Sequence, residues 1–93
     1  MLALTATTTA REQLRRLRES NPALFDLVGA RISAVRSDPA GSNAGRSFRL
    51  DDGGLARLIL FYDHLSGDDL VLVWVLDGEA MKIVAVEHAS SQD

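Results

Sequence analysis

Hydrophobic residues recur along this chain with two different periods, which divide it into a helical half and a strand half. In the helical half, apolar residues stand three or four positions apart between residues 24 and 35, as on the buried face of a helix. Asn21 and Pro22 mark where this helix begins, because asparagine caps a first turn and proline there loses no hydrogen bond. The apolar stripe consists of Leu24, Val28, Ile32 and Val35.

A shorter helix is expected before it, from Ala10 to about Arg18. Thr9 and, three residues on, Glu12 fit a capping box, in which each side chain satisfies the other's backbone N–H. Ahead of this helix, Met1–Ala6 alternates leucine with small residues, and this pattern predicts a brief edge strand. The chain is therefore expected to open with one short strand and two helices.

Ser37–Gly45 separates the two halves, and its proline, two glycines and lack of large apolar residues predict a flexible linker. Beyond it the hydrophobic pattern favours strands, with a polar hairpin loop at His64–Asp69. The expected strands are Arg46–Leu50, Leu55–Asp63, Leu70–Leu76 and Ala80–Val86.

Asp77-Gly78 is typical of a two-residue hairpin turn in which both central residues have positive φ. Such a turn would place Trp74 opposite Met81 and Leu72 opposite Ile83. The face that this register predicts for the core carries Leu70, Leu72, Trp74, Met81, Ile83 and Ala85.

The opposite face of these strands carries Val71, Val73, Val75 and Val84, and it is too apolar for open solvent. The sequence therefore predicts that a partner segment covers it, with a homodimer through the same valines as the alternative. The whole chain, residues 1–93, is expected to form one α+β domain with the order β-α-α-β-β-β-β, a two-helix hairpin packed on a mainly antiparallel sheet.

Composition narrows the class of protein. Apolar residues make up 46% of the 93 residues, enough for one compact domain, and the absence of cysteine excludes disulfides and thiolate metal sites. The longest apolar run, Leu70–Leu76, is far shorter than the roughly 20 residues that span a bilayer. Met1–Ala10 does not resemble a secretory signal, so a cytoplasmic protein without membrane contact is expected.

Charge is distributed unevenly along the chain. Residues 1–50 hold eight arginines and four acids, a net of +4, whereas residues 51–93 hold two basic residues and nine acids, a net of −7. The sum of these values is the formal charge of −3. A basic half can present a positive patch to a partner, although a basic solvated helix face explains the same pattern.

Familiar catalytic signatures, such as GxGxxG, a Walker loop or HExxH, are missing from the sequence. Asp63-His64 and Glu87-His88 look like metal-binding pairs, but adjacent residues of a strand point to opposite faces, so no metal site is expected.

Two arginines stand out, because a charge inside an apolar strand is costly unless it faces solvent or a partner. Arg57 interrupts LARLILFY, and Arg49 lies one strand earlier, in SFRL. A three-residue loop at Asp52–Gly54 would place them opposite each other on one face, where they would repel unless they shared an anion such as phosphate. With an even loop they diverge, and two separately solvated arginines are the alternative.

Element order and local sequence resemble the RelE/ParE superfamily of small bacterial toxins from toxin–antitoxin pairs. LALTATTTAREQLRRL is similar to the opening strand and helix of these toxins, and FRL…ARLILFYD to their two middle strands. The sequence that continues into WV-x-D, here Trp74, Val75 and Asp77, is most similar to the YhaV branch. The resemblance spans nearly the whole chain and consists mostly of hydrophobic patterns.

The resemblance implies the toxin of a type II system, a ribosome-dependent messenger RNA endonuclease without metal or other cofactor, with a cognate antitoxin as partner. Arg57 matches the arginine that stabilises the scissile phosphate while the neighbouring 2′-hydroxyl attacks, and Arg49 matches a basic position on the preceding strand. The same interpretation assigns RNA binding to Arg46 and Lys82 and proton transfer to His88.

Two features depart from the nuclease pattern. Many nuclease members carry a further basic residue and a Tyr or His for proton transfer after the last matching strand, whereas Asp77–Ala80 contains none, and Lys82 and His88 are loose substitutes. The acidic balance is also unusual for a protein that docks on ribosomal RNA. A gyrase inhibitor of the ParE kind, or a non-catalytic member that binds a protein, is therefore the alternative.

Overall fold

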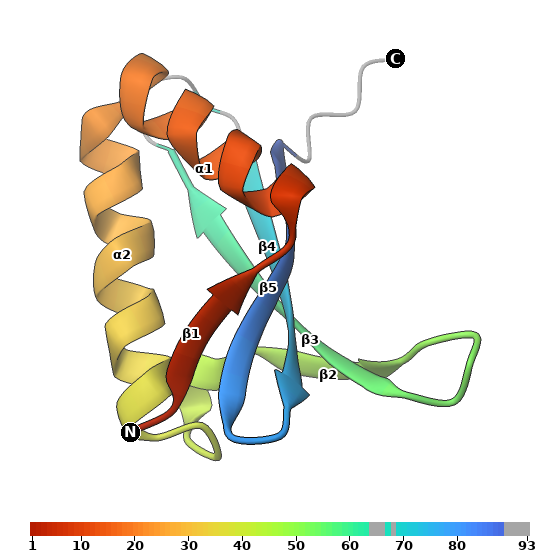
Figure 1. Ribbon diagram of the computed structural model, residues 1–93. Helices are drawn as coiled ribbons and strands as arrows, with labels where there is room; N and C mark the ends of the chain where they lie inside the picture. Colours follow the sequence, from red (N-terminus) through yellow and green to blue (C-terminus); the bar gives the residue numbers. More distant parts are fainter. Residues whose placement is uncertain (64–66, 68, 89–93) are drawn as a thin grey trace.

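The computed structural model describes residues 1–63, 67 and 69–88 and confirms an α+β architecture. The helices lie against one face of a five-stranded sheet (Figure 1). In chain order the elements are β1 (Ala3–Ala6), α1 (Thr8–Ser20), α2 (Pro22–Ser37), the 3-10 helix η1 (Ser42–Ala44), β2 (Arg46–Arg49), β3 (Leu55–Tyr62), β4 (Asp69–Asp77) and β5 (Ala80–His88).

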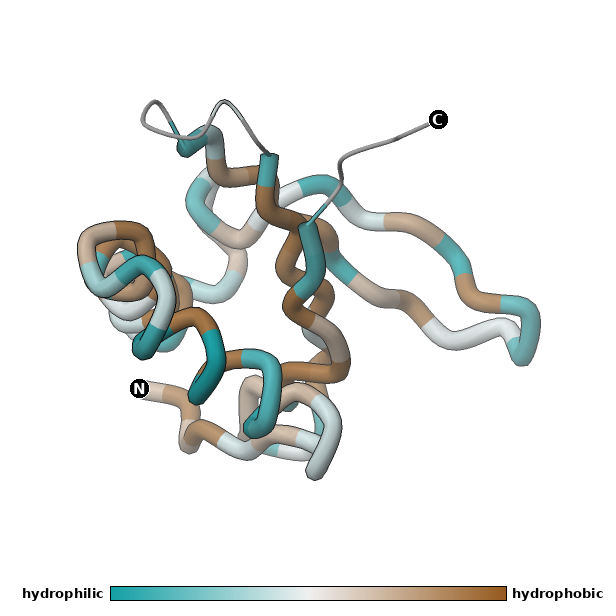
Figure 2. Tube along the Cα trace, turned by 90° about the horizontal axis from the view of Figure 1, so that it is seen from above, coloured by the Kyte–Doolittle hydropathy of each residue, from teal (hydrophilic) through white to brown (hydrophobic). Residues whose placement is uncertain are grey.

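The sheet has the strand order β1-β5-β4-β3-β2, so that the N-terminal strand is an edge strand, as the sequence predicts. β1 runs parallel to β5, and the other neighbours are antiparallel, which makes the sheet mixed. The far end of the β2–β3 hairpin projects away from the helices (Figure 1), and its tip is hydrophilic (Figure 2). No helix in the described part of the chain is long and apolar enough to cross a membrane.

The second helix begins as predicted, and the first begins earlier than predicted. Asn21 Oδ1 accepts a 3.2 Å hydrogen bond from Leu24 N–H, and Pro22 follows at the first helical position. The cap of α1 is Thr7, whose Oγ1 accepts from Ala10 N–H at 3.1 Å. The predicted capping box at Thr9 is therefore wrong, because Thr9 already lies inside the first turn.

The β4–β5 turn lies one residue later than predicted. Asp77 still pairs with Ala80, which leaves Gly78 and Glu79 as the two turn residues. Gly78 has a φ of +61°, and among the described residues only glycines have positive φ, the glycine-first pattern of a type II′ turn. Consequently Trp74 pairs with Ile83 rather than with Met81.

A β-bulge changes which residues of β5 face the core. Trp74 pairs with Ile83 but Val73 pairs with Ala85, so that Val84 is an extra residue on β5. Beyond this bulge the alternation is inverted, and Val86, at 4% exposure, occupies the core position predicted for Ala85. The other five predicted core residues of the hairpin are confirmed: Leu70, Leu72, Trp74, Met81 and Ile83.

The segment predicted as a flexible linker is packed against the sheet. Within it η1 buries Ala44 completely, and the Ala44 carbonyl accepts a 3.0 Å hydrogen bond from Trp74 Nε1. Gly45 follows with a φ of +94°, and a Cβ there would meet the backbone of Leu58 at 2.4 Å, so this close approach requires glycine. The loop expected at His64–Asp69 lies mostly outside the described residues, and β4 already includes Asp69.

The two faces of the sheet differ in what covers them. The inner face, which carries the buried residues Leu70, Leu72, Trp74, Met81, Ile83 and Val86, packs against the apolar stripe of α2 and against Leu17 of α1. All four residues of the predicted α2 stripe are buried. The outer face is the opposite side of β3, β4 and β5, and its central residues are Leu58, Leu60, Tyr62, Val71, Val73 and Val75.

Candidate functional site

Arg57 lies on the inner face, at the end of the sheet where the helix layer stops. It pairs with the buried Trp74 in the register of β3 and β4. Its Nη1 donates a long, 3.4 Å hydrogen bond to the Gly45 carbonyl, and its side chain is partly buried. A pocket of about 350 Å³ opens here, lined by Pro39, Leu55, Arg57, Trp74 and Leu76.

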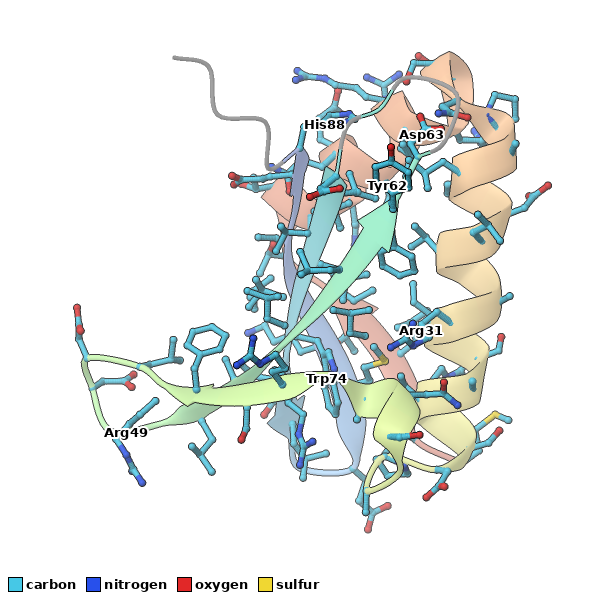
Figure 3. All side chains as sticks on the ribbon, turned by 180° about the vertical axis from the view of Figure 1, so that it is seen from behind. Arg31, Arg49, Tyr62, Asp63, Trp74 and His88 are labelled. Atoms are coloured by element: carbon cyan, nitrogen blue, oxygen red, sulfur yellow. The ribbon has the colours of Figure 1, made fainter. Side chains whose placement is uncertain are left out.

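Arg49 shares the face of Arg57 without converging on it. Five residues, 50–54, connect β2 and β3, and the register pairs Arg49 with Leu55 and Ser47 with Arg57. The two arginines are therefore two positions apart rather than opposite. Arg49 Nη1 donates to the Gly53 carbonyl in the hairpin turn at 3.2 Å, at the projecting end of the hairpin (Figure 3). The two guanidinium groups thus bind different carbonyls, those of Gly53 and Gly45, and do not form a shared anion site.

The other residues predicted for nuclease activity do not lie beside Arg57. Arg46 pairs with Leu58 and Lys82 pairs with Val75, so both lie on the outer face. His88 pairs with Leu70 at the other end of the sheet, well separated from Trp74 and Arg49 in Figure 3. The structure therefore distributes the predicted phosphate-binding and proton-transfer residues over two faces and two ends.

The outer face gathers a larger apolar surface than the sequence analysis predicted. Leu60 is 56% exposed and Tyr62 is 53% exposed, and Val71, Val73 and Val75 of the neighbouring strand are partly exposed beside them. Seen from behind, no helix of the described chain passes in front of β3, β4 and β5 (Figure 3). A contiguous exposed apolar patch on a small domain marks an interaction site.

Three residues of this patch were missed at the sequence level. Leu58, Leu60 and Tyr62 alternate along LARLILFY, and this alternation was the available signal. Their face depends on the β3–β4 register, which pairs Leu58 with Val73 and Leu60 with Val71. That register places the β3 residues on the same side as the three valines.

The basic helix face predicted from α1 is partly neutralised by acids of the same helix. Glu12 accepts hydrogen bonds from Arg15 and Arg16, and Arg15 also donates to Glu19 at 2.8 Å. The hydrogen bond from Arg15, with the charges of both arginines, holds the pKa of the Glu12 carboxyl below its ordinary value. The same pairing raises the pKa of Arg15. A solvated face stabilised by intrahelical pairs accounts for these two arginines.

No group of three or more His, Cys, Asp or Glu side chains suited to a metal ion occurs among the described residues. Comparison with known proteins finds no relative that identifies the chain: no protein-family model, no curated protein and no solved structure matches it. The geometry of Arg57 and of the outer face is therefore the basis for the proposals that follow.

Proposed function

We propose that this chain is a protein-binding domain of the RelE/ParE toxin type, which inhibits growth by docking a protein on its outer face. The observation that carries the proposal is the exposed apolar patch of Leu60, Tyr62 and the three valines of β4. Burial of apolar surface is the main driving force of protein association, and a sheet face offers it without rearrangement of the backbone. The resemblance in sequence supports the toxin assignment, with gyrase as the class of protein whose binding on this face inhibits growth and a cognate antitoxin as the neutralising partner.

The separation of the candidate catalytic groups favours binding over cleavage. A phosphodiester cleavage by the 2′-hydroxyl needs a cation on the phosphate and a proton-transfer group within hydrogen-bond reach of the same bond. Arg57 lies on the inner face, whereas Lys82 lies on the outer face and His88 at the opposite end of the sheet. These side chains are not arranged around one phosphate.

A messenger RNA endonuclease is the second candidate function, and one observation supports it, namely the surroundings of the Arg57 side chain. Among the described residues, the Gly45 carbonyl at 3.4 Å is the single hydrogen-bond partner of the Arg57 side chain, so most N–H donors of this guanidinium group remain available to an anion. The adjoining pocket, lined partly by Leu55 and Trp74, would accept a phosphate with an apolar body attached.

Induced expression in a bacterial host separates these functions. The proposal predicts growth arrest with intact transcripts, and it predicts that Arg57→Ala arrests growth as well as the parent chain does. Cleaved transcripts that disappear in Arg57→Ala would establish the endonuclease instead. Growth unaffected by either chain would remove the toxin assignment, and signs of DNA damage would identify gyrase as the partner.

A further inference from the structure

The pocket beside Arg57 has no role in the proposed function, although its lining has the composition of a ligand site. Its volume is about 350 Å³, and Arg57 is the one charged residue around it; the others are Pro39, Leu55, Trp74 and Leu76. In pockets that bind small ligands, apolar walls provide affinity and a few polar groups fix the orientation. The lining therefore indicates a ligand with both an apolar body and a negative charge.

Two leucines on neighbouring strands form the apolar walls of this pocket. Because Arg57 pairs with Trp74, the register of β3 and β4 places Leu55 opposite Leu76, two positions farther along each strand. Each leucine is 60% exposed, although both share the inner face with the core. An apolar group bound between them would remove this surface from water, which is favourable.

The guanidinium group of Arg57 has no counter-ion in this pocket. Among the described residues it donates one hydrogen bond, to the Gly45 carbonyl at 3.4 Å, and no acidic side chain forms an ion pair with it. The carboxyl of Asp38, which precedes Pro39 in the sequence, lies beside Gly41 instead. A partly buried cation among apolar side chains is stabilised by an anion that enters the pocket with it.

We infer that this pocket, which we call the Arg57 pocket, binds a carboxylate that carries an apolar body. The planar guanidinium fork can donate two parallel N–H bonds, one to each oxygen of a carboxylate. The apolar body would then lie between Leu55 and Leu76, over the indole of Trp74. This inference goes beyond the proposed function, because it concerns the inner face and holds whether or not the outer face inhibits growth.

The donors in the Arg57 pocket suit a carboxylate better than a phosphate. A phosphate monoester can enter the same space, but it has three terminal oxygens, more than one guanidinium fork can satisfy. The other side chains of the lining offer no free donor. Trp74 Nε1–H already donates to the Ala44 carbonyl, and Pro39, Leu55 and Leu76 have apolar side chains.

Two sources can supply such a carboxylate. One is an acidic side chain between apolar residues in a segment of a partner protein, and the other is a free small acid. The volume of the pocket is near the lower end of the roughly 300–1,000 Å³ of ligand sites, so it suits an apolar body the size of a phenyl ring or a leucine side chain.

NMR titration of the purified chain with 3-phenylpropanoate tests the inference. Trp74 is the single tryptophan of the sequence, so its indole N–H gives one distinct signal from the wall of the pocket. The expected result is a saturable shift of this signal and of the Arg57 Nε–H signal, with a dissociation constant in the low millimolar range or tighter. A chain that shows no saturable shift at millimolar probe would overturn the inference.

Two related probes test the chemical class of the ligand. The alcohol 3-phenylpropanol keeps the apolar body without the charge, and it should bind at least about tenfold more weakly than the acid. Phenyl phosphate should also bind more weakly than the acid, because its additional oxygens find no donor. An alcohol that binds as well as the acid would reduce the pocket to an apolar cavity, and tighter binding of phenyl phosphate would make it a phosphate site. Either result would overturn the inference.

Variants of the two arginines on this face test which guanidinium group binds the probe. Arg57→Ala should raise the dissociation constant of 3-phenylpropanoate by about tenfold or more, and Arg57→Lys, which keeps the charge without the fork, should have a smaller effect. Arg49→Ala is the matched control, because Arg49 shares this face but donates to the Gly53 carbonyl, and it should bind the probe like the parent chain.

Circular dichroism confirms that each variant is folded, and Arg57→Gln replaces Arg57→Ala if the alanine variant does not fold. Undiminished binding by the folded Arg57 variant would overturn the inference, and so would an equal loss in Arg49→Ala.

A capped peptide with one glutamate between two leucines distinguishes the two sources. Binding to the Arg57 pocket more tightly than 3-phenylpropanoate would identify a partner protein as the source, and weaker binding would identify a free acid; both support the inference. These measurements use the purified chain alone. A chain that binds the probe but does not affect growth retains the inference and removes the toxin assignment, whereas growth inhibition without probe binding does the reverse.

Discussion

The indole of Trp74 and the carbonyl of Ala44, thirty positions apart in the sequence, form a buried 3.0 Å hydrogen bond. It fastens the segment before β2 to the central strand β4. Trp74 is 2% exposed and lies in the same apolar cluster as Leu72 and Ile83. The indole is therefore part of the core and is not a platform for stacking RNA bases.

Two substitutions of Trp74 separate the hydrogen bond from the packing. Trp74→Phe keeps an aromatic ring but leaves the Ala44 carbonyl without its donor, and we expect a loss of about 1–3 kcal/mol in the free energy of unfolding. Trp74→Ala should cost about 3–5 kcal/mol, because it opens a cavity in the core. Urea unfolding of both variants measures these losses. Unchanged stability with lost RNA binding would instead support a stacking role.

Asn21 joins the corner between the helices to the end of β3. Its Oδ1 caps α2, and its Nδ2 donates a 2.6 Å hydrogen bond to Oδ2 of the buried Asp63. Asn21→Ala should destabilise the protein by about 2 kcal/mol, because the cap and a donor to a buried carboxylate are both lost.

Two further variants of Asn21 separate its capping of α2 from its hydrogen bond to Asp63, and chemical denaturation measures the stability of each variant. Asn21→Ser keeps a capping oxygen and should lose less stability than Asn21→Ala. Asn21→Asp also keeps a cap but places a second carboxylate beside Asp63, so it should be less stable than Asn21→Ser at neutral pH. Equal stability of the Asp and parent proteins would contradict this account of the corner.

The Glu12 carboxyl should titrate below the ordinary range of glutamate, because Arg15 and then Arg16 stabilise its charged form. A lowered pKa means that this contribution to stability is present above the ordinary pKa and is lost as the pH falls through the lowered one. NMR titration of the carboxyl measures the shift, and Arg15→Ala should move the pKa back toward its ordinary value. Because the pair is exposed, added salt should also reduce the shift.

The pattern of apolar residues is enough to predict the helices and strands, but not the pairing of β5. Ile83–Val86 is apolar at every position, so the sequence around Val84 has no alternation that would reveal a bulge there. The bulge lies where β1 ends and α1 begins: Thr7 N–H donates to the Ile83 carbonyl, and Gln13 Oε1 accepts from Val86 N–H at 2.7 Å. These contacts join residues more than seventy positions apart, and no local sequence pattern records them.

The candidate site was predictable only in part, because alternation along a strand assigns a face but does not fix how two strands pair. The valines of β4 follow from simple alternation, and the structure confirms that they share one face. Whether Arg49 and Arg57 converge depends on the length of the β2–β3 turn. The sequence is compatible with either an odd or an even number of loop residues, so it leaves the relative position of the two arginines open. The five-residue connection offsets the two arginines, and their side chains bind different carbonyls, Gly53 and Gly45.

The central claim is that the chain acts through its outer face, and a growth assay with matched expression levels tests it most directly. Leu60→Asp should abolish growth inhibition, because a carboxylate in the centre of the patch opposes burial against a partner. Arg57→Ala should inhibit growth as strongly as the parent chain. So should the matched control Leu27→Asp, which places the same carboxylate at a leucine of α2 that is as exposed as Leu60. Inhibition that survives Leu60→Asp and disappears in Arg57→Ala would contradict the account.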